Sequence, residues 1–373
     1  IEKLMASIDN EVGFYDESVN RYVHYAFSVP KTKDALLKKR AAFEKWSTAS
    51  FGMMSRLSDY AYALITGYYI DREKFAQYDA TFPQKIEAYY NQIKSERRLV
   101  TTAIADPQMD RSKAITERSE HALLRVVEER KDGVIVSGAK MIATGAPYVD
   151  DIIINTPYNS EDGESAYANF FIVPTQSDGV EIICRKSHAE NDPELYPIAS
   201  QFDEMDAVVI FNNVFIPNER IFIRGNAAGA TAAHRHQQLN TLAHYQTVIR
   251  LLTKLKFLAG VTTAVAESIK VTEFLNVQQK LGELYMQVDT IDALLQASEI
   301  DASLAENGVF TPNAVPLQVA RNLGTQYYGR ALTILKEIGA GGFTQLPSTL
   351  IERFDEEIQD QLHLYYEGAA TSA

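Results

Sequence analysis

The chain has 373 residues, 46% of them hydrophobic, which is enough for a sizeable core and for more than one domain. Its net charge of −13 argues against nucleic acid or an anionic membrane surface as the main partner. Its one cysteine, Cys184, excludes an intrachain disulfide, a multi-thiolate zinc site and a cysteine-ligated iron–sulfur cluster. Such sparse cysteine use is consistent with a cytoplasmic location.

Neither a membrane-spanning helix nor a signal peptide is expected from the sequence. No uninterrupted apolar run reaches about 18 residues. The chain opens with Ile1-Glu2-Lys3, without an initiator Met or a basic-then-apolar pattern. We therefore expect the natural N-terminus to precede Ile1.

Residues 1–100 are expected to form an N-terminal helical domain. The segment 35–43 is rich in helix-forming residues and follows Pro30. A Tyr-rich apolar stripe at helical spacing follows, and its ordinary interpretation is core packing. The stripe consists of Tyr62, Leu64, Ile65, Tyr68 and Tyr69.

Residues 101–228 change to short β-rich runs and are expected to form a central β domain. The turn signal Lys131-Asp132-Gly133 separates two such runs and predicts a hairpin. Gly-containing turns separate the other runs, so the region predicts a compact β-barrel or sandwich. The remaining runs are residues 151–155, 168–174, 179–184 and 207–211.

Residues 229–373 are expected to form a C-terminal helical bundle. Apolar residues recur at helical spacing over 248–259. A second long helix is predicted to run to about residue 307, and a third from about 317 to 338, ending at a glycine-rich stop. The chain is thus predicted to be α+β, in the domain order of the acyl-CoA dehydrogenase fold.

Five segments, in the same order, resemble the oxygenase component family of 4-hydroxyphenylacetate 3-monooxygenase. Residues 52–60 read Gly-Met-Met-Ser-Arg-Leu-Ser-Asp-Tyr, close to the family's Gly-Met-Met-Gly-Arg-Ser-Pro-Asp-Tyr signature. The other four segments are residues 106–113, 136–146, 200–217 and 279–284.

The resemblance implies a two-component flavin-dependent monooxygenase. Reduced FAD would come from a separate NAD(P)H-flavin reductase, and with O2 it would form a C4a-hydroperoxyflavin that hydroxylates a phenol ortho to its hydroxyl group. A homotetramer is also implied. No Gly-x-Gly-x-x-Gly segment lies between a predicted strand and a helix, so no nicotinamide site is expected. FMN in place of FAD stays open.

Arg56 and Tyr60 lie four residues apart on a predicted helix and so share a face. The guanidinium group of Arg is permanently charged and carries its N–H donors in a fork. The Tyr hydroxyl can donate a hydrogen bond to a phenolate or a peroxide. The resemblance implies that both are catalytic and line the substrate pocket. The ordinary alternative is a surface Arg stacked on a Tyr.

Thr144-Gly145-Ala146 follows a predicted strand and resembles the family's flavin-contacting loop. Gly permits close backbone approach, and the Thr144 hydroxyl would bond near N5 of the flavin or the peroxide. The alternative is an ordinary turn at a strand end.

Arg250 is a candidate for the FAD pyrophosphate, because charge-assisted bonds to phosphate are strong. Its alternative is a solvated helix face. Gly341, Gly342 and Ser348 resemble a C-terminal cofactor loop that, in this fold, often reaches the flavin of a neighbouring subunit.

His244 is the candidate for peroxide stabilisation or for taking the substrate proton, and it is expected just before the helix that bears Arg250 and Lys254. Related chlorophenol monooxygenases resemble this chain in having a His in this region. A structural His is the alternative, and His234 and His236 compete for the role. No carboxylate or thiolate cluster supports a metal site there.

The sequence departs from the family at a substrate-binding position. The family usually has a His where this chain has Thr102, and Leu57 and Ser58 replace a Ser/Thr-Pro pair. Thr is shorter and never cationic, so we expect a phenol other than 4-hydroxyphenylacetate, such as one carried by a natural-product intermediate. The family also continues beyond the end seen here.

Three alternatives to this function follow from the residues. An acyl-CoA-dehydrogenase-like flavoprotein would need a catalytic base, for which Glu204, Glu267 and Glu283 are available. The related 4-hydroxybutyryl-CoA dehydratase needs three cysteines and is excluded. A degenerate, non-catalytic family member would retain only the scaffold.

Overall fold

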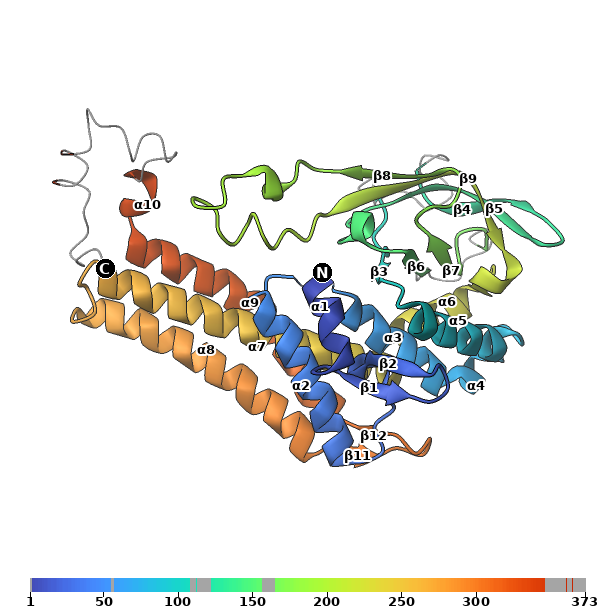
Figure 1. Ribbon diagram of the computed structural model, residues 1–373, viewed down its shortest axis with the longest axis horizontal. Helices are drawn as coiled ribbons and strands as arrows, with labels where there is room; N and C mark the ends of the chain where they lie inside the picture. The colour runs from blue at the N-terminus through green and yellow to red at the C-terminus, as the bar shows by residue number, and fades with distance from the viewer. Residues whose placement is uncertain are drawn as a thin grey trace.

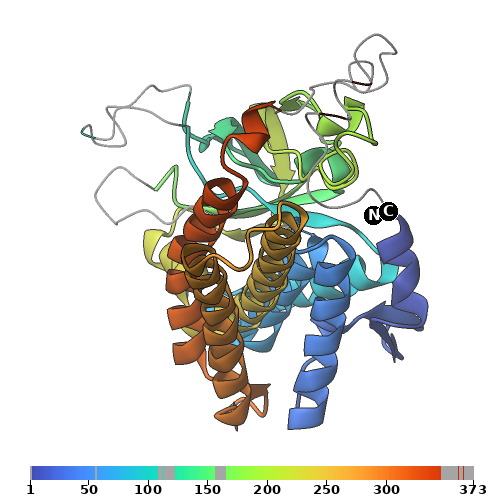
Figure 2. The same ribbon diagram turned by 90° about the vertical axis from the view of Figure 1, so that its left-hand side faces the viewer.

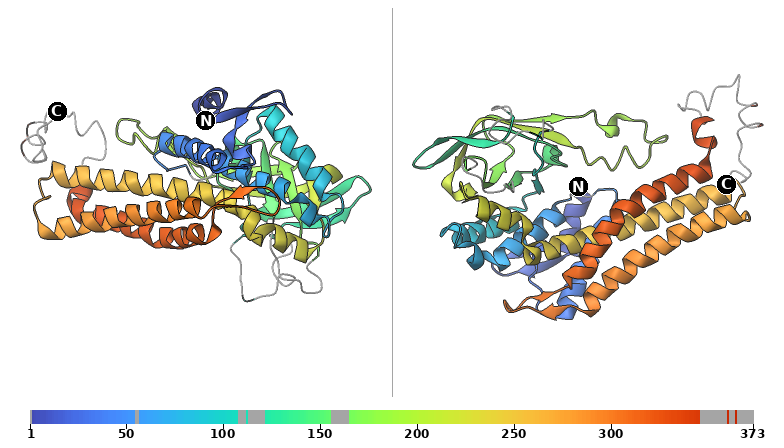
Figure 3. Two further views of the ribbon diagram at one scale, coloured as in Figure 1. Left: turned by 90° about the horizontal axis from the view of Figure 1, so that it is seen from below. Right: turned by 180° about the vertical axis from the view of Figure 1, so that it is seen from behind.

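The computed structural model describes residues 2–54, 57–107, 112, 122–155, 165–345, 360 and 364. Helices form one layer, and two β-sheets lie over one end of it (Figure 1). Three long helices extend the helical layer beyond the sheets (Figure 3). The predicted order of helices, sheets and helical bundle along the chain is confirmed.

The N-terminal helices pack their apolar faces into one core. Thr32 begins the second helix, since its Oγ1 accepts a hydrogen bond from Ala35 N (3.2 Å). The Tyr-rich stripe is core, as expected, and Tyr69 stacks on Tyr90 with 4.2 Å between ring centroids. Its buried members are Tyr62, Leu64, Ile65 and Tyr68. The helices are α1 (Glu2–Ala6), α2 (Lys33–Ala49), α3 (Ser58–Ile70), α4 (Arg72–Phe75) and α5 (Phe82–Glu96).

A two-stranded hairpin interrupts this region, where only helices were expected. Strands β1 (Gly13–Asp16) and β2 (Arg21–His24) pair antiparallel. Phe14 and Val23 pack on the helical core, while the adjacent Tyr15 and Tyr22 are exposed, as expected where successive side chains point to opposite faces of a strand. The turn is closed locally, because the Asp16 carboxylate accepts from Ser18 N (2.9 Å) and Asn20 adopts φ 52°. These local preferences outweigh the helical pattern on either side.

The central region is a β-sandwich of two four-stranded sheets, in orders β10-β7-β6-β3 and β4-β5-β9-β8. Side chains from both sheets share one apolar core. The hairpin predicted around Lys131-Asp132-Gly133 is confirmed as β4–β5. The strands are β3 (Val100–Thr102), β4 (Arg125–Glu129), β5 (Gly133–Lys140), β6 (Asp151–Asn155), β7 (Phe170–Pro174), β8 (Val180–Cys184), β9 (Ala207–Pro217) and β10 (Ile221–Ile223).

Strand β6 is buried on both faces and joins the two layers. Ile152 and Ile154 face the sandwich core, while Ile153 belongs to the helical core. This explains why the strand is a continuous apolar run rather than an alternating one. Strand β3 runs parallel to β6, with Thr102 opposite Ile153.

The C-terminal helices lie side by side (Figure 2). The second long helix ends earlier than predicted, at Ile300 rather than near residue 307, because a short hairpin turning at Gly308 (φ 74°) follows. None of the helices in the described ranges is long and apolar enough to cross a membrane. The elements are α6 (Ala227–Arg235), α7 (Gln237–Ser268), α8 (Leu275–Ile300), β11 (Ser303–Leu304), β12 (Phe310–Thr311), α9 (Ala314–Gly339) and α10 (Gly342–Gln345).

Candidate active site between the helical layer and the sandwich

A pocket lies where α1, α2 and the start of α3 meet the loop after β5. Its walls are largely apolar, and it brings together residues that are distant in sequence. Its lining includes the polar residues Ser58, Thr144 and Glu204. The remaining lining residues are Leu4, Met5, Trp46, Met54, Leu57, Leu99, Gly145, Tyr148 and Val149.

The predicted flavin loop forms part of this wall and is held from two sides. The Thr144 carbonyl accepts from Thr101 Oγ1 (2.6 Å), and the Thr144 hydroxyl donates to Asp206 Oδ1 (2.5 Å). Gly145 has φ 79° and donates its N–H to Met205 O (3.0 Å). That conformation favours glycine, so the loop can turn sharply without strain. Ala146 is buried at the start of the following 3-10 turn.

Two of the predicted substrate residues lie on α3 and β3, which pack together, and neither of them lines the pocket. Tyr60 lies in the first turn of α3 and is half-buried. Thr102 ends β3 and is only 9% exposed. Ser58 connects the two elements, because its Oγ accepts from Val100 N (2.9 Å). Arg56, the other predicted substrate residue, lies outside the described residues.

Sequence reasoning missed Asp59, a buried carboxyl group behind the pocket. Burial raises its pKa to about 7, against the opposing hydrogen bond from Gln246 and the charge of Arg250. Gln246 Nε2 lies 3.2 Å from both carboxyl oxygens. The position inside the segment 52–60 was the only available signal, because the partners come from α7, almost 200 residues away.

Arg250 and Lys254 lie one turn apart on α7, where the segment 50–54 packs. Arg250 Nη1 donates to Gly52 O (3.4 Å). Burial, and then the charge of Arg250, lowers the pKa of Lys254 to about 8, while Glu204 acts in the opposite direction. Lys254 is thus within charge range of the pocket residue Glu204, and Arg250 lies one turn before it.

The structure corrects the expected place of His244, which lies inside α7 rather than before it. Its Nδ1 lies 3.2 Å from Gln318 Nε2 on α9, and it does not line the pocket. Burial, and then Arg321, lowers its pKa to about 4. Burial also lowers the pKa of His234 and of His236. Within the described ranges, no group of three or more His, Cys, Asp or Glu side chains could hold a metal ion.

The C-terminal candidates are only partly described. Gly341 and Gly342 are exposed and follow the end of α9. Ser348 lies outside the described residues. Of the carboxylates considered for an acyl-CoA dehydrogenase base, Glu204 lines the pocket and Glu283 on α8 is bound by Arg330.

Comparison with known proteins places the chain in a family. Models of the N-terminal and C-terminal parts of 4-hydroxyphenylacetate 3-hydroxylase match residues 4–223 and 230–373. The chain belongs to this family. The 4-hydroxyphenylacetate 3-monooxygenase oxygenase component of Geobacillus sp. is 34% identical over 93% of this chain and 71% of its own length. That of Thermus thermophilus is 31% identical over 97% and 74%.

A solved structure of such an oxygenase component, complexed with FAD and 4-hydroxyphenylacetate, has a TM-score of 0.88. It is 28% identical and covers 96% of this chain and 74% of its own. The predicted family, the acyl-CoA-dehydrogenase-like fold, the FAD cofactor and the flavin-dependent aromatic monooxygenase class are confirmed.

The described residues of this family member suit a flavin. A glycine turn without a side chain lets an isoalloxazine ring approach the backbone at Gly145. Beside it stands a hydroxyl, that of Thr144, and the apolar walls limit access of water. Arg250 and Lys254 are the cations on the adjoining part of α7, and neither lines the pocket.

Proposed function

We propose that this chain is the oxygenase component of a two-component system that hydroxylates a phenol other than 4-hydroxyphenylacetate, ortho to its hydroxyl group. Reduced FAD, delivered by a separate NAD(P)H-flavin reductase, supplies the electrons and reacts with O2. The observation that carries the substrate proposal is Thr102, a short neutral side chain that ends β3 and is largely buried.

Charge is the reason that Thr102 bears on the substrate. A His at this position can become cationic and attract a carboxylate or phenolate, whereas Thr is limited to one neutral hydroxyl. The pocket has mostly apolar walls, and among the residues that the structure describes Glu204 is the carboxylate that lines it. Such a lining suits a phenol with an apolar substituent better than an arylacetate.

The roles of the other residues follow from their places. The Thr144–Ala146 loop would hold the isoalloxazine ring, and Arg250 would bind the diphosphate. Arg56 and Tyr60 would orient the phenol, with Tyr60 at the start of α3. The apolar wall around Trp46 would keep water from the reaction.

We also propose that the chain acts as a homotetramer, in which Gly341, Gly342 and Ser348 reach the flavin of a neighbouring subunit. The exposure of Gly341 and Gly342 at the end of α9 supports this.

The experiment compares 4-hydroxyphenylacetate with a neutral phenol, p-cresol, as substrates for the wild type and Thr102→His. Catechol formed per reduced FAD oxidised is measured together with kcat/KM. The wild type should favour the neutral phenol. Thr102→His should shift the ratio of kcat/KM values toward 4-hydroxyphenylacetate by roughly tenfold, the effect of a charged hydrogen bond.

Thr102→Val is the control, because it keeps the size of the side chain and removes the hydroxyl without adding charge. This variant should still have the higher kcat/KM with the neutral phenol. A wild type that already prefers 4-hydroxyphenylacetate would contradict the substrate proposal. Oxidation of reduced FAD without hydroxylation of any phenol would contradict the proposed activity.

A further inference from the structure

The hydroxyl group of Thr144 donates its proton in a hydrogen bond within the protein. Its Oγ1 donates to Asp206 Oδ1 across 2.5 Å, a short bond of the kind formed to a charged acceptor. A carboxylate only accepts hydrogen bonds, and a Thr hydroxyl carries one proton. While this contact holds, Thr144 Oγ1 can offer other partners only its lone pairs.

The backbone on both sides holds this contact in place. Ala143 N donates to Ala207 O (2.9 Å), and Gly145 N donates to Met205 O (3.0 Å). These two bonds bracket Thr144 on one segment and Asp206 on the other. Thr144 and Asp206 are therefore opposite each other on two adjacent backbone segments. This backbone pairing fixes the orientation of the Thr144 hydroxyl group.

Thr144 is fixed from its other side by β3. Its carbonyl accepts from Thr101 Oγ1 (2.6 Å), a side chain that is 2% exposed. The polar group that Thr144 contributes to the pocket wall is thus a rigidly held acceptor.

We propose that Asp206 makes the Thr144 hydroxyl a hydrogen-bond acceptor for the flavin and so favours reduced over oxidised FAD. Reduced isoalloxazine carries an N5–H donor, which pairs with such an acceptor. Oxidised isoalloxazine has a lone pair at N5, which an acceptor leaves unsatisfied. Asp206 is a positioning residue that acts through Thr144. The selectivity would retain the flavin that the reductase delivers and release it after turnover.

This inference rests on the proposed function, since it requires FAD beside the Thr144–Ala146 loop. Its test is the binding of FAD itself: dissociation constants of oxidised FAD by fluorescence titration, and of reduced FAD by the same method under anaerobic conditions. The quantity of interest is the ratio of the oxidised to the reduced dissociation constant.

Asp206→Asn should lower this ratio about tenfold, equivalent to about 30 mV in the two-electron potential of the bound flavin. The amide can donate to Thr144 Oγ1, which frees the hydroxyl proton to turn toward N5. Loss of the negative charge alone would raise this ratio, because it would strengthen the binding of the more anionic reduced flavin. A fall in the ratio therefore reports the hydroxyl.

Thr144→Val removes the acceptor without changing Asp206 and should lower the ratio by a similar factor, so the test survives if Asp206→Asn fails to fold. The double variant should fall no further than either single one. Thr144→Ser keeps the hydroxyl and should keep the wild-type ratio. Asp178→Asn is the matched control, because Asp178 is an exposed aspartate of the same sandwich that does not line the pocket.

A ratio within twofold of the wild type in both Asp206→Asn and Thr144→Val would overturn the inference. An equal fall in Asp178→Asn would do the same, since it would show a general charge effect. A wild type that binds neither redox form of FAD would instead contradict the proposed function.

Discussion

Gly52 shows why one residue of the segment 52–60 is a glycine. It adopts φ 67°, and a Cβ there would lie 2.6 Å from Lys254 N and 2.9 Å from Arg250 O. Both atoms belong to the backbone of α7, which cannot move aside like a flexible side chain. The glycine therefore lets the segment that leads to Arg56 pack directly against the helix that bears the two cations.

We predict that Gly52→Ala lowers the free energy of unfolding by about 2–3 kcal/mol, from the strained φ and the displaced backbone. Gly282→Ala is the control, because its Cβ would meet nothing within 4 Å on the exposed side of α8. That change should stabilise the protein by up to about 1 kcal/mol through helix propensity. Urea denaturation measures both. Equal stability of Gly52→Ala and the wild type would contradict this account.

At the scale of elements, α2 is attached to the core by a buried lysine. Lys39 is fully buried, and its Nζ donates to Ala26 O (2.7 Å). Burial lowers its pKa to about 7. Thr66 Oγ1 donates to the same carbonyl (3.0 Å), so the carbonyl keeps a partner if the amine is removed.

This lysine predicts a pH dependence of stability. Between about pH 7 and the unfolded pKa of 10.5, the unfolded chain binds a proton that the folded chain does not, so the contribution to stability rises with pH. It is lost as the pH falls toward 7. Lys39→Met should flatten this slope and raise the free energy of unfolding at pH 7 by about 1–3 kcal/mol.

The measurement is the urea midpoint at a series of pH values from 6 to 10. Lys38→Met is the control, because Lys38 is the residue before Lys39, is exposed and pairs with Asp34 on the surface. It should leave the slope unchanged. A Lys39→Met protein with the wild-type slope would show that another group causes the pH dependence.

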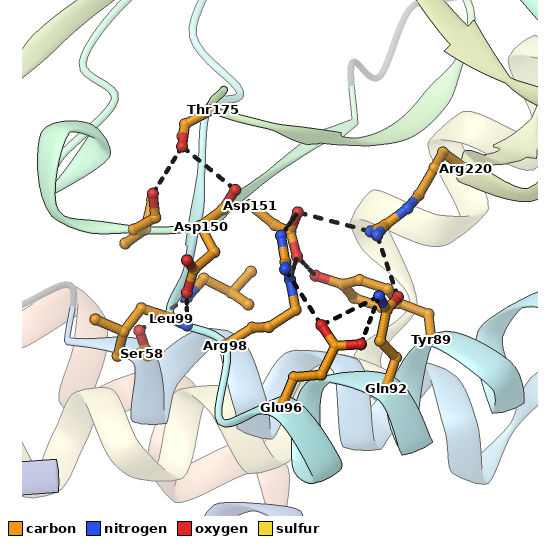
Figure 4. Close-up of polar contacts among 12 residues, drawn as sticks. Ser58, Tyr89, Gln92, Glu96, Arg98, Leu99, Asp150, Asp151, Thr175 and Arg220 are labelled. Atoms are coloured by element: carbon orange, nitrogen blue, oxygen red, sulfur yellow. Dashed lines mark hydrogen bonds and ion pairs between the residues drawn. The ribbon is translucent and has the colours of Figure 1, made fainter. Parts of the chain in front are cut away.

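At the scale of the whole molecule, one carboxylate joins the helical layer to the sandwich (Figure 4). Asp151 at the start of β6 is fully buried and accepts from Arg98 Nε (2.6 Å) and Nη2 (2.9 Å). Tyr89 OH on α5 donates to it (3.0 Å), and Arg220 Nη1 lies 3.6 Å away. The charge of Asp151 is thus shared between two cations from different layers.

Asp151→Asn should destabilise the protein by about 3–5 kcal/mol, because it leaves two partly buried cations without their acceptor. Asp150→Asn is the matched control, because Asp150 is the exposed neighbour of Asp151 and an amide oxygen can still accept from Leu99 N, which lies 2.8 Å from Asp150 Oδ2. Asp150→Asn should lower the free energy of unfolding by less than about 1 kcal/mol. Urea denaturation followed by circular dichroism measures both. A small effect of Asp151→Asn would contradict the bridging role.

Local chemistry was sufficient for much of the fold. The turn at 131–133, the strand 151–155 and the end of α9 near Gly339 depend on residues only a few positions apart, and the structure confirms them. The pattern failed near residue 305, where a short hairpin replaces the last turns of the predicted helix. There, Phe310 N donates to Pro30 O (2.7 Å), a partner 280 residues away.

The sequence by itself determined the family, because five short segments kept their order, and it determined the residues to examine, such as Thr102 and Thr144. Only the tertiary structure decided which of them meet. It placed His244 within α7 against Gln318, and Asp206 on the Thr144 hydroxyl. Hydrogen-bond polarity and burial depend on partners that are remote in the chain, and local periodicity carries no information about them.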